Sequence, residues 1–334
     1  VQALSTTGLL GPVASAVAQA QEKIGDAAGL TRQGALATEV LPRMLGENGT
    51  RRYLLLFQNN AEIRSDGGLV GAWAEIVASK GRITLGTQGS GQELGKLPRS
   101  ATRLTSGEKS LLTSRIGWDL RDTVKVPDFA RAAELAANIL KQGQGTTVDG
   151  VISIDPVTLS YLLDATGPVT LADGSRLDGS NAVERLLNKA YLDIPVPLQD
   201  AYFASAAEKI FSKVTSGAGD TSKLLKGLKR ATEERRVLVW SRDRTVRREL
   251  ADTPLAGSTS VPSPAVGFYL NNYVSSKMDY YLRYTVAGTS QCVDGRQRYT
   301  IEGRLRSEAP ADAATLPAYI ASDGKNARPG TIGL

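Results

Sequence analysis

Residues 59–68 form a polar stretch whose side chains could bind phosphate. Arg64 and Asp66 lie among the amides Asn59 and Asn60 and the acid Glu62, and two glycines follow. An arginine presents a rigid pair of donors to two phosphate oxygens, while an aspartate can hold a divalent cation that bridges them. These residue types favour a site for a phosphorylated ligand. The alternative is a polar connection between strands, in which Asn and Asp side chains bond their own backbone.

A second group of charged side chains follows Trp118. It contains Asp119, Arg121 and Asp122, with Asp128 a little further along the chain. Two acids beside an arginine could supply a metal ligand or a second phosphate contact. The simpler interpretation is a helix cap by Asp128 and a surface ion pair, which contributes little stability.

A buried strand must position the first polar stretch. Tyr53–Phe57 is a continuous apolar run, which is typical of a strand buried on both faces. Open α/β sheets bind ligands at the carboxyl ends of such strands, so the pattern predicts a binding loop at residues 59–68. Leu69–Ala78 and Arg82–Thr87 are predicted as the next two strands, joined by a hairpin turn at Lys80-Gly81.

Helices and strands then alternate along the chain. Pro127 and Asp128 predict the start of a helix that runs to about Gln142, because proline and an acid both favour the first turn. Further strands are predicted at 150–154, 169–171 and 237–240, and further helices at 157–165 after Asp155-Pro156, 180–189 after Ser180, 199–214 and 222–234. Lys189 in one of these helices could reach an anion, although charged helix faces are usually only solvated.

Three regions of the chain differ in composition. Residues 1–46 are Ala-rich with helical periodicity, whereas clustered tyrosines and alternating runs at 280–286 and 298–306 indicate antiparallel strands. A Pro/Ser/Gly-rich segment at 253–264 is typical of a domain boundary. We predict an N-terminal helical segment (1–46), a three-layer α/β/α core with a mixed sheet (47–252) and a C-terminal antiparallel β domain (265–334).

The composition excludes several classes of function. There is no histidine among the 334 residues, which excludes a Ser-His-Asp triad and a His-ligated zinc site. The single cysteine, Cys292, forms no intrachain disulfide. A net charge of +6 favours anionic partners, but no basic stripe alternates with aromatic residues, so no nucleic-acid partner is expected.

The apolar runs are also too short to cross a bilayer. We therefore expect any membrane tether to lie outside the given chain, as a missing N-terminal helix, and we expect the chain to continue beyond Leu334.

Several motifs together resemble one bacterial surface family, the domain of unknown function 4012. The longest is the run from Tyr53 to Gly71, YLLLFQNNAEIRSDGGLVG. Its further landmarks match WDLRD from Trp118, PDF from Pro127, VISIDP from Val151 and MDYYL from Met278. The resemblance spans nearly the whole chain and implies a cell-surface location, without naming an activity.

The order of elements is more distantly similar to the LytR–CpsA–Psr family, which transfers pyrophosphate-lipid-linked glycopolymers onto peptidoglycan. Arg64-Ser65-Asp66 stands where that family has Arg-Ser-Asp, and Leu163–Val169 resembles its Asp-Ala-Leu-Gly-Gly-Val segment. This resemblance implies that Arg64 holds the pyrophosphate and Asp66 a magnesium ion. The acid that the family has ahead of this motif is replaced by an asparagine here, and its Pro-Arg-Asp motif has no clear counterpart.

The resemblance implies an extracytoplasmic protein that handles phosphate-containing, lipid-linked or cell-wall glycans, as a magnesium-dependent phosphotransferase or a phosphodiester-cleaving enzyme. In that case Asp66, Arg64 and Glu62 are the candidate catalytic residues, and Asp66 and Asp122 hold Mg²⁺. The predicted ligand-binding residues are Asn59, Asn60, Arg64, Arg121 and Lys189. The alternative is a non-catalytic envelope protein that keeps the fold and binds a glycan, a lipid head group or a partner protein.

Overall fold

The structure is a computed structural model and describes residues 38–260, 265–325 and 327–334. Most of the predicted N-terminal helical segment lies outside these residues, although 38–44 are helical. The chain divides into a small unit that includes residues 38–51 and 78–82, and a larger unit of residues 52–77 and 83–334. The candidate site belongs entirely to the larger unit, to which the following description is confined.

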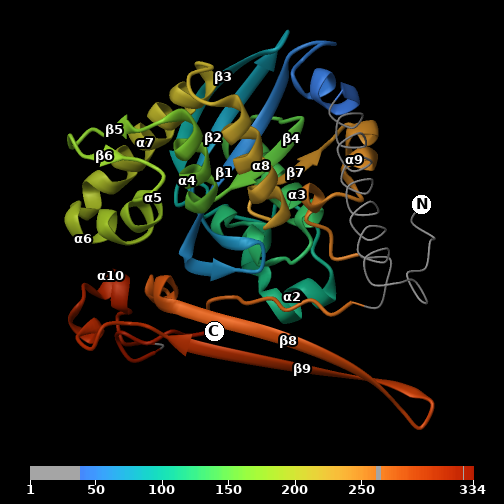
Figure 1. The fold of residues 1–334 in the computed structure, drawn as a ribbon, viewed down its shortest axis with the longest axis vertical. Coiled ribbons are helices and arrows are strands. Elements are labelled where there is room, and N and C mark those ends of the chain that lie inside the picture. The colour runs from blue at the N-terminus through green and yellow to red at the C-terminus, as the bar shows by residue number, and fades with distance from the viewer. Residues whose placement is uncertain (1–37, 261–264, 326) are drawn as a thin grey trace, which may run out of the picture. The chain divides into compact units, whose positions relative to one another are not determined.

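The core of the larger unit is a five-stranded mixed sheet in the order β3-β2-β1-β4-β7 (Figure 1). Tyr53 pairs with Gly150 and Phe57 with Ile154 in parallel, because the chain crosses over between β1 and β4, whereas β7 pairs antiparallel with β4. The strands are β1 (Arg51–Arg64), β2 (Gly67–Ser79), β3 (Arg82–Ser90), β4 (Gly150–Ile154) and β7 (Leu238–Ser241). The predicted central strand and the mixed α/β class are confirmed.

The predicted loop at residues 59–68 is wrong, because most of this segment is strand. β1 continues to Arg64 and β2 begins at Gly67, so that only Ser65 and Asp66 form the turn. Pairing continues past the apolar run because glycine allows a close approach of the two strands. A Cβ atom on Gly68 would lie 2.2 Å from the carbonyl oxygen of Asn59. The polar side chains are therefore fixed on a paired strand instead of a loop.

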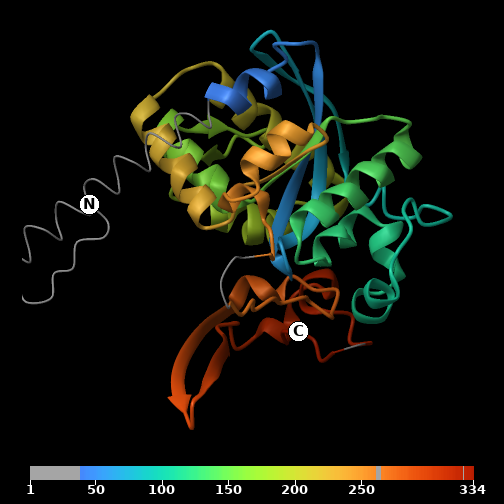
Figure 2. The same ribbon diagram turned by 90° about the vertical axis from the view of Figure 1, so that its right-hand side faces the viewer.

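Helices cover both faces of the sheet, as Figure 2 shows with α3 (Phe129–Gln144) on one side and α4 (Pro156–Thr166) and α8 (Thr221–Glu233) on the other. Leu54 and Leu56 are fully buried in a cluster with α3, and the alternate residues Tyr53 and Leu55 are buried as well. This burial on both faces explains the continuous apolar run and confirms the three-layer core.

Two predicted helix starts are confirmed by their caps. The Asp128 carboxylate accepts a hydrogen bond from the Arg131 amide, and the Asp155 carboxylate accepts one from the Thr158 amide. Ser180 does not cap the next helix, because its hydroxyl donates to Asp178. That helix begins at α5 (Ala182–Glu184), continues as a π-helical turn η3 (Arg185–Lys189) and ends as α6 (Ala190–Asp193).

The long helix α7 (Val196–Thr215) packs with α4 and the π-helical turn around a second apolar cluster. This cluster includes Leu159, Leu163, Leu186, Tyr202 and Ile210. The remaining short elements are β5 (Val169–Thr170), β6 (Arg176–Leu177), α2 (Ser106–Leu112), η1 (Ser114–Gly117), η2 (Leu120–Lys125), α9 (Arg244–Leu250), η4 (Pro254–Ala256), η5 (Met278–Tyr281), η6 (Ala313–Thr315) and α10 (Ala318–Ala321).

The C-terminal region contains a separate antiparallel pair, β8 (Leu282–Val293) and β9 (Arg296–Ser307), as predicted (Figure 1). The segment before it is bonded to the end of β1. The Asn272 amide donates to the Ile63 carbonyl over 2.9 Å, and the Ile63 amide donates to the Asp279 carboxylate over 2.9 Å. The boundary predicted at residues 253–264 stays a prediction.

Candidate ligand-binding cavity

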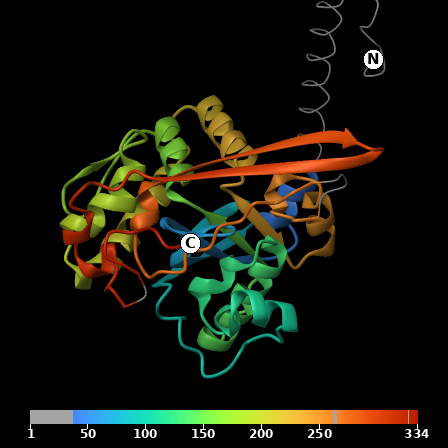
Figure 3. The same ribbon diagram turned by 90° about the horizontal axis from the view of Figure 1, so that it is seen from below.

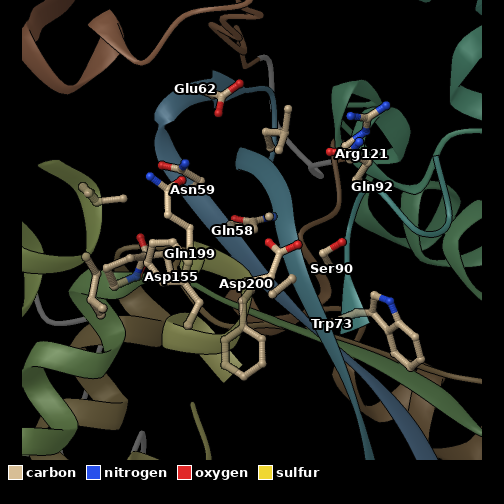
Figure 4. Close-up of a pocket in the computed structure, with 18 of the residues that line it drawn as sticks. Gln58, Asn59, Glu62, Trp73, Ser90, Gln92, Arg121, Asp155, Gln199 and Asp200 are labelled. Carbon is tan, nitrogen blue, oxygen red and sulfur yellow. The ribbon is translucent and has the colours of Figure 1, made fainter. Parts of the chain in front are cut away.

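A cavity of about 640 Å³ opens beside the C-terminal half of β1 and the N-terminal half of β2. Its walls come from these strands, residues 88–93, the η1 and η2 turns, α4, η3, α7 and the C-terminal segment 272–277. Figure 4 shows Gln58, Asn59 and Glu62 along β1, with Arg121 and Gln92 across from them. The volume is in the range of small-molecule and cofactor sites.

One wall of the cavity is organised by Asp119, whose side chain is fully buried. Its carboxylate accepts from Arg121 Nε over 2.9 Å and from Arg121 Nη2 over 2.8 Å, a bidentate arrangement. Arg115 Nη2 donates to the same carboxylate over 2.8 Å. The hydrogen bonds from Arg121 to Asp119 raise the pKa of Arg121 above its ordinary value. Asp119 thus fixes two guanidinium groups at the cavity.

A second acid, Asp122, attracts three cations. Arg115 Nε lies 2.9 Å, Lys125 Nζ 3.3 Å and Arg64 Nη2 3.8 Å from its carboxylate oxygens. Burial lowers the pKa of Lys125, and the charges of Arg64 and Arg115 act in the same direction while Asp122 opposes them. Together with Arg121 and Asp119, this wall carries four cations and two anions. Its net charge of about +2 favours an anionic ligand.

Three buried N–H donors of cavity-lining residues have no hydrogen-bond partner among the described residues. They are Gln58 Nε2, Arg64 Nε and Trp73 Nε1. An unpaired buried donor costs about 1–3 kcal/mol, so three at one site need an explanation. Oxygen acceptors of a ligand would satisfy these donors once neighbouring side chains shift, because the three atoms have almost no accessible surface. Two acceptors on other lining residues, Asn272 Oδ1 and Asp122 Oδ2, accept no hydrogen bond among the described residues, although Asp122 Oδ2 is ion-paired with Arg115 and Lys125. Arg64 is only 8% exposed and its Nη1 donates to the Ile63 carbonyl, so its free Nε has a fixed position.

The C-terminal segment closes part of the cavity. The Lys277 ammonium forms an ion pair with Glu62 and lies 4.4 Å from the ring centroid of Tyr191. Tyr191 in turn accepts a hydrogen bond from Asn59 Nδ2 over 2.8 Å. Glu62 is thereby neutralised by a residue 215 positions later in the chain, although two more acids, Glu93 and Asp200, also line the cavity.

The other side of the cavity carries most of its apolar lining, together with the polar side chains Asp155, Gln199 and Asp200. Side chains from α4, the η3 turn and α7 line it, and these elements also build the second apolar cluster. The apolar lining residues there are Leu159, Leu186, Leu187, Phe203 and Ile210. The π-helical turn places two consecutive leucines in this wall. A ligand with a charged group at one end and a hydrocarbon part at the other would match the two sides.

The structure brings together most of the site residues predicted from the sequence. Asn59, Glu62, Arg64, Arg121 and Asp122 all line the cavity.

Three other predicted residues do not line it: Asn60, Asp66 and Lys189. Lys189 is exposed on the η3 turn, and Asp66 lies in the β1–β2 turn, where its amide donates to the Val124 carbonyl. Burial raises the pKa of Asp66 well above its ordinary value; the charge of Arg235 lowers it and that of Asp128 raises it further.

Several lining residues were not predicted. Trp73 and Gln58 belong to strands, where burial hides their donor groups from any sequence pattern. Arg115 precedes Asp119 by four residues, a spacing typical of an ion pair, and that signal could have identified it. Lys277 carried no local signal, because its partner Glu62 is distant in the chain.

The residues present do not fit a magnesium site shared by Asp66 and Asp122. Only Asp122 lines the cavity, and three cations already surround it. In the described part of the chain, no group of three or more His, Cys, Asp or Glu side chains could hold a metal ion. Magnesium binding therefore stays a prediction.

Comparison with known proteins supports the first resemblance. Residues 48–191 match the family described as "Protein of unknown function (DUF4012)", so the predicted resemblance is confirmed over that segment. No curated protein matches the chain. The likeness to the LytR–CpsA–Psr family stays a prediction.

Solved structures show only weak similarity. A transcriptional regulator from Enterococcus faecalis is 14% identical with a TM-score of 0.33, covering 77% of this chain and 84% of its own. A protein from Streptococcus agalactiae is 13% identical with a TM-score of 0.40, covering 64% and 76%. A transcriptional regulator from Bacillus subtilis is 7% identical with a TM-score of 0.33, covering 76% and 90%. Similarities at this level carry no argument about function.

Proposed function

We propose that the cavity binds a ligand with a phosphate group and a hydrocarbon part, of the class of lipid-linked or cell-wall glycans, in an extracytoplasmic protein of the cell envelope. The observation that carries the proposal is the group of unpaired buried donors on Gln58, Arg64 and Trp73 beside a wall of excess positive charge. Phosphate oxygens accept several charge-assisted hydrogen bonds at once, which is what this wall offers.

The apolar side of the cavity supports the hydrocarbon part of the ligand. Burial of each CH₂ group contributes about 0.8 kcal/mol, so a few isoprenoid or acyl carbons against α4 and α7 would add substantially to a phosphate contact. The described residues contain no helix that is long and apolar enough to cross a membrane. A tether outside the given chain stays part of the proposal.

The arrangement favours binding over catalysis. Asp119 and Asp122 are neutralised by arginines and a lysine, and Glu62 by Lys277, while the two further lining acids, Glu93 and Asp200, lie on exposed positions outside this charged wall. A general base or metal ligand needs a carboxylate that is free to act. The second candidate, a metal-dependent phosphotransferase, is supported by Glu62 and Asp122 lining the same cavity as Arg64. It requires the ligand to displace one of these ion pairs.

The proposal is tested by calorimetry with farnesyl pyrophosphate as a soluble probe. Arg64→Ala should lose about 1.5–3 kcal/mol of binding free energy, the usual contribution of a charge-assisted contact. Arg64→Lys should lose much of this binding free energy as well, because an ammonium group cannot reproduce the two parallel hydrogen bonds of a planar guanidinium. Arg248→Ala is the matched control, since its side chain is 75% exposed outside the cavity. Equal affinities of wild type and Arg64→Ala would refute the anion role of this wall.

Trp73→Phe gives a second test, which keeps an aromatic ring but removes the indole N–H. Because Trp73 Nε1 has no partner in the described part of the chain, the change removes no hydrogen bond within it, but the smaller ring leaves a cavity in the core and should lower the free energy of unfolding, which urea denaturation measures separately. The binding free energy of farnesyl pyrophosphate should become less favourable by about 1 kcal/mol if that N–H donates to the ligand. Unchanged affinity would remove Trp73 from the site.

Catalysis is decided separately by incubation with lipid-linked glycan precursors, with and without Mg²⁺, and mass spectrometry of the products. Binding without turnover supports the binding protein. Magnesium-dependent transfer or cleavage, lost in Arg64→Ala, supports the enzyme.

A further inference from the structure

The β8–β9 pair is a ribbon with two chemically different faces. Directly paired residues point to the same face, so the register sorts the side chains into two sets. One set is apolar and includes Leu282, Tyr284, Val286, Tyr299, Ile301 and Leu305. The other set holds five arginines and one acid: Arg283, Arg296, Arg298, Arg304, Arg306 and Glu302.

Neither face is covered within the described residues. Every residue of β9 is exposed, and all of β8 except its two ends is exposed as well. Figure 3 shows the ribbon along its length. Tyr299 is 53% and Leu305 46% exposed, although side chains of this size are usually buried on one face of a sheet. Phe268 extends the apolar face, with its ring centroid 6.3 Å from that of Tyr284.

A two-stranded ribbon with an open apolar face is marginally stable in water and needs a cover. A second copy of the chain would provide too little area. Twelve residues at about 3.4 Å each give a face roughly 40 Å long and about 10 Å wide. Two such faces would bury about 800 Å² in total, less than the roughly 1,200–2,000 Å² of stable interfaces.

The charge on the ribbon identifies a better occupant. Five arginines against Glu302 and the turn residue Asp294 give residues 282–307 a net charge of +3, and Glu308, directly after the ribbon, pairs with Arg283 and Arg306. The arginines stand on the opposite face, but their side chains are long enough to bend past the strand edges towards phosphates on the apolar side. Tyrosines, which form part of the apolar face, are enriched at membrane–water interfaces.

We propose that the β8–β9 ribbon binds the surface of an anionic lipid bilayer, with the apolar face in the interfacial layer and the arginines at the lipid head groups. This inference does not depend on the ligand of the cavity. It concerns a different surface, and the two can fail separately.

Cys292 provides a direct test, because it is the only cysteine and lies on the apolar face opposite Gln297. An environment-sensitive fluorophore on Cys292 should shift to the blue with vesicles of phosphatidylcholine and phosphatidylglycerol, and nitroxide lipids should quench it. Cys292→Ser with Gln291→Cys moves the label to the adjacent residue on the arginine face, where both effects should be much smaller. Equal responses at the two positions, or none at either, would overturn the orientation.

Vesicle co-sedimentation of the full chain separates the contribution of the apolar face to membrane binding from that of the arginines. Val286→Ser with Ile301→Ser should lower the partition coefficient roughly tenfold or more, and Arg298→Gln with Arg304→Gln should do the same only on anionic vesicles. The matched controls change exposed residues elsewhere: Leu111→Ser with Leu225→Ser, and Lys209→Gln with Arg248→Gln. The proposal would be refuted if the control substitutions lowered the partition coefficient as much as the ribbon substitutions do.

Sedimentation velocity without lipid tests the competing occupant. A dimer that dissociates on Val286→Ser with Ile301→Ser, together with no vesicle binding, would assign the face to a second copy instead. Farnesyl pyrophosphate affinity of the same variants should equal that of wild type, because the ribbon residues do not line the cavity.

Discussion

The arginines of the cavity and those of the β8–β9 ribbon have the same side chain in opposite surroundings. Arg64 and Arg121 are mostly buried and held by hydrogen bonds, to the Ile63 carbonyl and to Asp119, whereas Arg304 is 80% exposed and lies 4.0 Å from Glu302. A fixed guanidinium can select the geometry of one phosphate group. A row of exposed guanidinium groups offers charge to many phosphates at once, which suits a surface such as a bilayer.

The comparison teaches that the number of cations in a segment does not predict what it binds. The ribbon has the denser arginines, yet the cavity has the acids that position them. The following predictions test whether the two regions differ as strongly in energy as they do in surroundings.

The largest difference is expected when an apolar side chain is shortened in the central sheet and in the ribbon, and the two losses of unfolding free energy are compared. Leu55→Ala in β1 should lower the free energy of unfolding by about 2–5 kcal/mol, because Leu55 is buried between the layers. Ile301→Ala on the ribbon should change it by less than about 0.5 kcal/mol, because the side chain is 44% exposed. Urea denaturation of both variants measures this. A loss under half a kcal/mol for Leu55→Ala would contradict the central position of β1.

The next difference concerns the acids. Asp119→Asn removes the charge that holds Arg115 and Arg121, and should lower the free energy of unfolding by about 2–3 kcal/mol, less than for a fully buried pair because both arginines are partly exposed. Glu302→Gln on the ribbon should have almost no effect, since exposed ion pairs contribute little. Chemical denaturation at low and high salt checks both values. Similar small losses would mean that the cavity wall is not fixed by Asp119.

A pH-dependent effect on stability is expected at Asp279. Its carboxylate accepts a hydrogen bond from the Ile63 amide at the end of β1, and it lies just before β8 of the ribbon. Burial raises its pKa to about 6; Asn272, the Ile63 amide and Arg64 lower it, and Glu62 raises it. The ordinary value of 3.8 applies when the chain is unfolded. The folded state therefore binds the proton more tightly, so stability falls as the pH rises from about 4 to about 6.

Asp279→Asn should remove this dependence. The variant should be about 1–2 kcal/mol more stable than wild type at about pH 7.5. The full pKa shift sets an upper limit of about 3 kcal/mol on this gain. At about pH 4 the gain should be small or zero. Urea denaturation at both pH values measures the difference. A gain that is equal at the two values would show that Asp279 does not titrate in this range.

The smallest effect is expected for the ribbon arginines in solution. Arg298→Gln with Arg304→Gln should leave the free energy of unfolding within about 0.5 kcal/mol of wild type, because both side chains are exposed. Thermal and urea denaturation without lipid measure it. A large loss would mean that these arginines stabilise the fold, and that their effect on vesicle binding is indirect.

The sequence by itself determined the sheet and the starts of its helices. Tyr53–Phe57 is apolar without interruption because both faces are covered, and Asp128 and Asp155 cap their helices through bonds to amides three residues later. Signals of this kind are local and remain readable in the chain. The motif around Arg64 also located the correct part of the sheet, since Asn59, Glu62 and Arg64 lie in the central strand, directly after its apolar run.

Only the tertiary structure decided which polar residues meet. Asp66 was predicted beside Arg64, but the tight β1–β2 turn places it outside the cavity lining. The positive wall depends on Lys277 neutralising Glu62, and the unpaired donors of Gln58 and Trp73 depend on what the packing leaves without partners. These properties arise from contacts between distant segments, which no local spacing encodes. The two faces of the ribbon likewise follow from the register of β8 with β9, and their exposure follows from the absence of a covering layer in the described chain.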